Sequence, residues 1–123
     1  MTNTKVIAVV NDLFFGAKIN EAAKHAGVAL EYATNEAALM EKAKGNPALI
    51  VFDLNYSAVN PVELIKKLKA DGTLKQIGLI GYLSHVQTDL ALAAQQAGCD
   101  EVMPRSAFSM NLLQILKRHA GTP

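Results

Sequence analysis

Polar side chains that could do chemistry follow four short apolar runs of this sequence. The run "LIVFD" ends on Asp53, and the earlier run "KVIAVV" is followed by Asn11 and Asp12. Ser84 and His85, a hydroxyl and an imidazole, follow the run "IGLIGYL". Arg105 and Ser106, a guanidinium and a hydroxyl, follow "EVMP". Asp53 is therefore either a reactive carboxylate displayed at the end of a buried strand or only the polar residue that closes one.

The spacing of apolar residues predicts the elements that position these groups. Short apolar runs predict strands, and segments of helical period predict helices between them. Asn60 and Pro61 have the types that begin a helix, whereas Gly72 and Gly98 have the type that ends one. The predicted strands cover 5–10, 28–33, 48–53, 77–83 and 101–104, and the helices cover 15–26, 35–44, 61–71, 86–97 and 107–119.

This alternation predicts an α/β fold with a doubly wound, five-stranded parallel sheet and five helices. The expected strand order is 2-1-3-4-5, as in flavodoxin-like folds. In such sheets ligands bind beyond the carboxyl ends of the strands, beside the switch between strands 1 and 3. All the polar groups named above fall at that edge.

Composition narrows the class of protein. The chain has 123 residues, of which 50% are hydrophobic and 19% charged, so we expect one compact domain over 1–123. A net charge of +1 argues against binding nucleic acid or an anionic membrane through bulk electrostatics. The apolar start is short, no segment reaches membrane-spanning length, and the single Cys99 excludes an internal disulfide. These features predict a cytoplasmic protein.

The chain resembles the receiver domain of bacterial two-component response regulators, the CheY-like family, over essentially its whole length. The resemblance rests on "VVND", "FDLN", "GYLSH" and "AGCDEVMPRSAF" at the ends of strands 1, 3, 4 and 5. It implies that Asp53 is the candidate phosphoacceptor. It also implies that Asp12, Asp53 and the backbone carbonyl of Asn55 are candidate ligands of Mg²⁺, the one cofactor expected. Ser84, His85 and Arg105 are then the candidate contacts of a phosphoryl group.

Several residues depart from the family pattern. Asn11 replaces the first of two acids, which weakens the metal site by one charge, and Arg105 stands where the family has a lysine. Arginine prefers bidentate carboxylates, so Arg105 could instead hold Asp53 or Asp12 in a permanent salt bridge. The hydroxyl position after strand 4 falls on Tyr82 or Leu83, with Ser84 just beyond, and Val102 replaces a switch aromatic. The sequence therefore predicts a degraded switch, a pseudo-receiver.

Each signal also has a structural interpretation. Asp53 could cap its strand, Asn11 and Asp12 could cap the first helix, and His85 could sense pH, bind a ligand or only hydrogen-bond locally. A hydrolase triad of Ser84, His85 and Asp53 is set aside because no G-x-S-x-G turn is present.

Three functions follow from these patterns. The leading one is a stand-alone, non-enzymatic signalling module that acts by contact with a histidine kinase or a downstream target. The contact surface, which could also form a homodimer, is expected on the fourth helix, the fifth strand and the last helix, where Met110, Leu113 and Gln114 lie. The alternatives are a working receiver phosphorylated on Asp53 with Mg²⁺, and a module that binds a small anion in the crevice.

Overall fold

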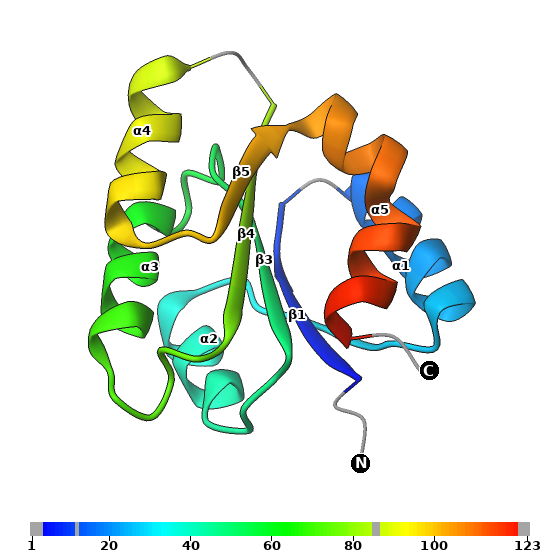
Figure 1. Cartoon of the computed structure of the whole chain (residues 1–123), viewed down its shortest axis with the longest axis horizontal. Helices are drawn as coiled ribbons and strands as arrows, with labels where there is room; N and C mark the ends of the chain where they lie inside the picture. Colours follow the sequence, from blue (N-terminus) through cyan, green and yellow to red (C-terminus); the bar gives the residue numbers. More distant parts are fainter. Residues whose placement is uncertain (1–3, 12, 85–86, 121–123) are drawn as a thin grey trace.

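The computed structural model describes residues 4–11, 13–84 and 87–120. Five parallel strands form one sheet in the order β2-β1-β3-β4-β5 (Figure 1), which confirms the predicted fold. The strands are β1 (Lys5–Val9), β2 (Ala29–Tyr32), β3 (Leu49–Asp53), β4 (Gly78–Leu83) and β5 (Glu101–Pro104). The helices are α1 (Leu13–Ala26), α2 (Glu36–Ala43), α3 (Pro61–Ala70), α4 (Thr88–Ala97) and α5 (Arg105–Ala120).

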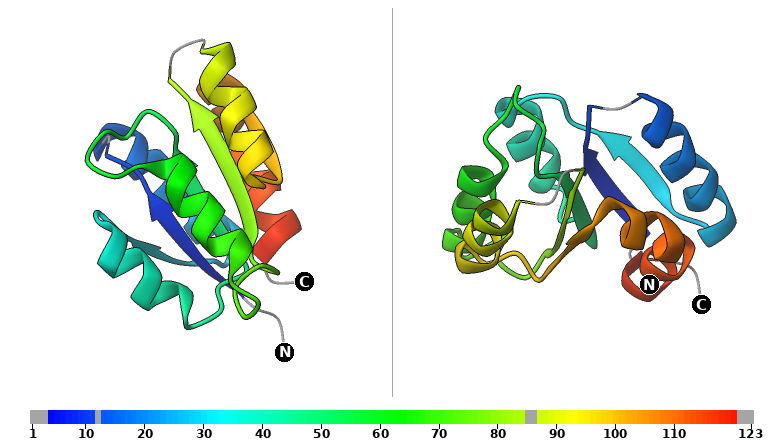
Figure 2. Two further views of the ribbon diagram at one scale, coloured as in Figure 1. Left: turned by 90° about the vertical axis from the view of Figure 1, so that its left-hand side faces the viewer. Right: turned by 90° about the horizontal axis from the view of Figure 1, so that it is seen from above.

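Helices cover both faces of the sheet. Helices α1 and α5 pack on one face, and α2, α3 and α4 pack on the other (Figures 1 and 2). Strand β3 is buried along its whole length because it has neighbouring strands on both sides and helices on both faces. Alternate residues of β3 then enter opposite core layers: Ile50 and Phe52 face α2–α4, whereas Leu49 and Val51 face α1 and α5.

Local sequence signals explain where α3 begins and where α4 ends. The side chain of Asn60 accepts a hydrogen bond from the backbone N–H of Glu63 at 3.3 Å, and Pro61 is the first residue of α3, as predicted. Gly98 ends α4 with a left-handed φ of 111°, also as predicted. Gly72 does not end α3, because the helix stops at Ala70 and Asp71 follows in an extended conformation.

The last helix begins earlier than predicted. Arg105 is its first residue and follows β5 without a loop, whereas we expected the helix to start at residue 107, with Arg105 and Ser106 between the strand and the helix. The apolar stripe of α5 starts only at Phe108, so its polar first turn leaves no periodic signal. Among the described residues, no helix is both long enough and apolar enough to cross a membrane.

Candidate functional site at the carboxyl edge of the sheet

Asp53 is the last residue of β3 and is only 7% exposed. Its side-chain Oδ1 accepts a hydrogen bond from the backbone N–H of Asn55 at 2.9 Å. Its carbonyl oxygen accepts a second bond from the N–H of Tyr56 at 3.0 Å. The carboxylate therefore builds an Asx-type turn that ends the strand. The structural role considered for Asp53 is present, and its reactivity remains a prediction.

The side chain of Asn55 joins the loop after β3 to the loop after β4. Its Oδ1 accepts a hydrogen bond from the backbone N–H of Ser84 at 2.7 Å, and its Nδ2 donates to Oε1 of Gln87. The sequence pointed only to the backbone carbonyl of Asn55 and not to this role of its side chain. The available signal was the amide itself, which offers a donor and an acceptor together.

Strand register decides which residue of β4 stands beside Asp53. Asp53 pairs with Tyr82, one of the two residues that the sequence analysis considered for the hydroxyl position, so Tyr82 is the neighbour of Asp53 on β4. The Tyr82 ring is fully buried, stacked on Phe108 with centroids 5.0 Å apart and tilted against Phe15 at 5.1 Å. Leu83 instead packs against the core layer of α2–α4. A bulky aromatic ring thus fills the space under the site on the α1 and α5 face.

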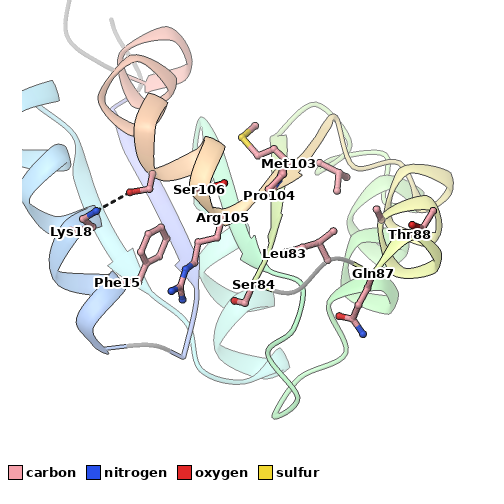
Figure 3. A pocket seen from close by; sticks show the side chains of 13 residues that line it. Phe15, Lys18, Leu83, Ser84, Gln87, Thr88, Met103, Pro104, Arg105 and Ser106 are labelled. Atoms are coloured by element: carbon pink, nitrogen blue, oxygen red, sulfur yellow. Dashed lines mark hydrogen bonds between the residues drawn. The ribbon is translucent and has the colours of Figure 1, made fainter.

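Arg105 reaches the same edge from the start of α5. Its guanidinium carbon lies 5.2 Å from the centroid of the Phe15 ring, within the range of a cation–π contact. Figure 3 shows its side chain extending toward Phe15. Arg105 therefore contacts the Phe15 ring, a contact that the sequence did not indicate. A salt bridge from Arg105 to Asp53 or Asp12 remains a prediction.

The structure places the remaining predicted residues as follows. Asn11 is exposed two residues after β1, and Ser84 is exposed one residue after β4. Asp12 and His85 lie outside the described residues. Within 4–11, 13–84 and 87–120, no three His, Cys, Asp or Glu side chains gather in a way that could hold a metal ion.

A pocket of about 690 Å³ opens beside this site, between α4, β5 and the start of α5. Its lining combines apolar side chains with several hydroxyls and two basic groups (Figure 3). We call it the α4–β5 pocket, and the residues that define it here are Lys18, Leu83, Ala91, Val102 and Arg105. The sequence pattern did not predict this pocket.

Comparison with known proteins gives a likeness in structure only. No protein-family model matches the sequence, and no curated protein sequence matches it either.

Solved structures of response regulators share the fold at low sequence identity. CheY4, a chemotaxis response regulator of Vibrio cholerae, has a TM-score of 0.80 at 19% identity, covering 95% of this chain and 98% of that chain. The phosphorylated cyanobacterial phytochrome response regulator RcpA has a TM-score of 0.78 at 21% identity, covering 94% and 90%. The Mn²⁺-bound form of response regulator Rcp1 has a TM-score of 0.75 at 18% identity, with the same two coverages. The chain therefore has the fold of a CheY-like response-regulator receiver domain.

Proposed function

We propose that this protein is a receiver-like signalling module of the two-component, phosphorelay type, and that it acts by protein–protein contact with a degraded phosphorylation pocket. The observation that carries the proposal is the pairing of Asp53 with Tyr82. A receiver-like switch is expected to need a small hydroxyl beside the acceptor carboxylate. Here that position holds an aromatic side chain committed to the core between α1 and α5.

The replacement of a lysine by Arg105 supports the same conclusion. A lysine ammonium is a compact charge on a flexible stem, whereas the guanidinium is a planar fork that stacks on rings. Arg105 lies over Phe15 in this arrangement. Its position is therefore tied to an aromatic contact, which disfavours movement toward a phosphoryl group.

A working receiver is the second candidate, because an acidic side chain is retained at the end of β3. Three of the structural neighbours are described as phosphorylated, Mn²⁺-bound or BeF₃-activated. The ligands that the resemblance implies are oxygen atoms, which suit Mg²⁺. Asp53 and the carbonyl of Asn55, together with Asp12, would hold the ion, with the neutral Asn11 lowering its affinity.

One experiment separates the two candidates. The protein is incubated with Mg²⁺ and acetyl phosphate, and its intact mass is measured beside an Asp53→Asn control. In a working receiver, a carboxylate oxygen of Asp53 attacks the phosphorus and acetate leaves, so the mass rises by one phosphoryl group. We expect no gain. A stoichiometric gain that Asp53→Asn lacks would replace the pseudo-receiver with the working receiver.

The proposed partner is a histidine kinase or a downstream target, bound on the surface formed by α4, β5 and α5. Met110 is 85% exposed and Leu113 is 37% exposed on α5, and Gln114 beside them is also exposed. Apolar side chains displayed in this way favour contact with another protein. The same surface could join two copies of the chain.

A further inference from the structure

We propose that the α4–β5 pocket binds a small organic anion with an apolar body. Its volume of about 690 Å³ lies inside the range of small-molecule sites. The pocket lies between α4 and α5, on the opposite side of β4 from the crevice between β1 and β3. The proposal does not depend on the phosphorylation chemistry of Asp53.

The apolar part of the pocket exists because two small residues stand on facing elements. Ala91 comes from α4 and Val102 from β5, and Leu83 lies beside them at the end of β4. Leu83 and Val102 are half-buried and pack against the core layer of α2–α4, so their positions are fixed by packing. An aromatic side chain at position 91 or 102 would occupy the space. The walls therefore offer an apolar body a preformed surface.

The charge of the pocket selects an anion. Among the lining residues that the structure describes, the charged ones are Lys18 of α1 and Arg105 of α5, and both are basic. Lys18 Nζ donates a hydrogen bond to Oγ of Ser109 at 2.9 Å, which holds it toward α5. Both cations lie on the α1 and α5 side of the pocket, whereas Leu83 and Thr88 lie toward α4 (Figure 3). A ligand with an anionic head and an apolar body matches this asymmetry.

The wall of the pocket is also connected to Asp53. Ser84 and Gln87 line the pocket, and both are hydrogen-bonded to the side chain of Asn55. The backbone N–H of Asn55 in turn donates to the carboxylate of Asp53. An occupant would thus touch the loop that Asn55 holds beside Asp53.

The test uses a pair of fluorescent probes that differ in charge. Anilinonaphthalene sulfonate carries an aromatic body and an anionic head, and phenylnaphthylamine has the same body without the charge. We expect one sulfonate probe to bind per chain, more tightly than the neutral probe, with amide NMR shifts centred on Leu83, Ala91 and Val102. Shifts elsewhere, or no saturable binding, would overturn the proposal.

Variants separate the apolar part of the site from its charge. Val102→Phe fills the pocket and should abolish binding of both probes, with Ala91→Phe as a second filling variant should the first fail to fold. Lys18→Gln should lower the affinity for the sulfonate probe about threefold and leave the affinity for the neutral probe unchanged. Lys24→Gln, on the same helix but outside the pocket, is the matched control.

Two results would contradict the proposal directly. If Lys18→Gln and Lys24→Gln change the affinity for the sulfonate probe equally, the charge of Lys18 in the pocket does not select an anion. Shifts at the same amides that appear on raising protein concentration without any probe, and that the sulfonate probe does not displace, would assign the pocket to a second copy of the chain.

Discussion

The side-chain amide of Asn55 connects two loops that the backbone leaves apart. It accepts from Ser84 and donates to Gln87, while its own N–H donates to Asp53. Each bond alone has a modest net effect on stability, on the order of 1 kcal/mol. Their arrangement matters more, because they connect the turn after Asp53 to Gln87, the residue before α4.

Asn55→Ala should loosen the loop before α4 more than it destabilises the whole fold. We expect a loss of about 1 to 2 kcal/mol in the free energy of unfolding and faster amide hydrogen exchange at Ser84. Asn111→Ala is the matched control, because Asn111 donates from an exposed position to the carbonyl of Ala107 within α5. Unchanged exchange at Ser84 in Asn55→Ala would show that the amide does not hold this loop.

Residue positions at the site could be predicted only where the strand pattern determined them. Asp53 and Arg105 were assigned to one edge because the carboxyl ends of parallel strands meet there. The Tyr82 contacts could not be predicted, since the sequence allowed two alignments that differ by one residue. The register that makes Tyr82 the neighbour of Asp53 depends on packing across the whole sheet. The ring cluster of Phe15, Tyr82 and Phe108 joins three elements that are remote in sequence.

Some helix ends could be predicted from neighbouring residues alone, whereas others depend on the fold. The start of α3 was predictable because Asn60 and Pro61 act on their own neighbours. The end of α3 was not, because glycine signals a helix end only where a left-handed conformation is needed. Gly72 has no positive φ, and Gly98 has one.

These two glycines provide a matched pair of substitutions. A Cβ at Gly98 would lie 2.7 Å from Cγ of Lys69 and on a φ of +111°, whereas a Cβ at Gly72 would meet nothing within 4 Å. Gly98→Ala should therefore reduce the free energy of unfolding by about 1 to 2 kcal/mol. Gly72→Ala should be neutral or stabilising by less than about 1 kcal/mol, because it restricts the unfolded chain.

Urea unfolding monitored by circular dichroism gives both values. Equal losses in the two variants would mean that the left-handed end of α4 contributes nothing beyond the loss of a glycine. A larger loss in Gly72→Ala would place the helix stop where the sequence predicted it.

Across the whole molecule, the last helix carries a group that makes stability depend on pH. His119 is half-buried near the end of α5, and its Nδ1 lies 3.5 Å from where a Cβ on Gly78 of β4 would stand. Burial lowers the pKa of His119 below its ordinary value of 6.5, and the neighbouring positive charge of Arg118 lowers it further. Glu101 and Asp100 act in the opposite direction with smaller effect.

The unfolded chain therefore binds a proton at this position more tightly than the folded one. The contribution of His119 to stability is complete above its ordinary pKa and is lost as the pH falls through its lowered, folded-state pKa. We expect the free energy of unfolding to decrease as the pH falls below the ordinary pKa of 6.5, and His119→Gln to reduce that slope. Identical slopes in the two proteins would assign the pH dependence to other groups.

The exposed face of α5 displays apolar side chains. Of the described residues, the exposed large hydrophobic side chains are Leu92, Met110 and Leu113, and two of these lie on α5. The inward stripe of the same helix, which includes Phe108 and Leu112, already packs on the sheet. Met110 and Leu113 thus have no role in the core, which is why they support the proposed contact surface.

Met110→Glu tests whether that surface joins two copies of the chain. A charge at this position adds a desolvation cost to any apolar contact but leaves the core untouched, so the variant should fold with unchanged stability. Sedimentation equilibrium should show concentration-dependent dimers for the parent protein and a monomer for Met110→Glu. Ala17→Glu, exposed on α1, is the control and should dimerise like the parent. If the parent stays monomeric at all concentrations, the homodimer is excluded, and a different protein is the remaining partner proposed for this surface.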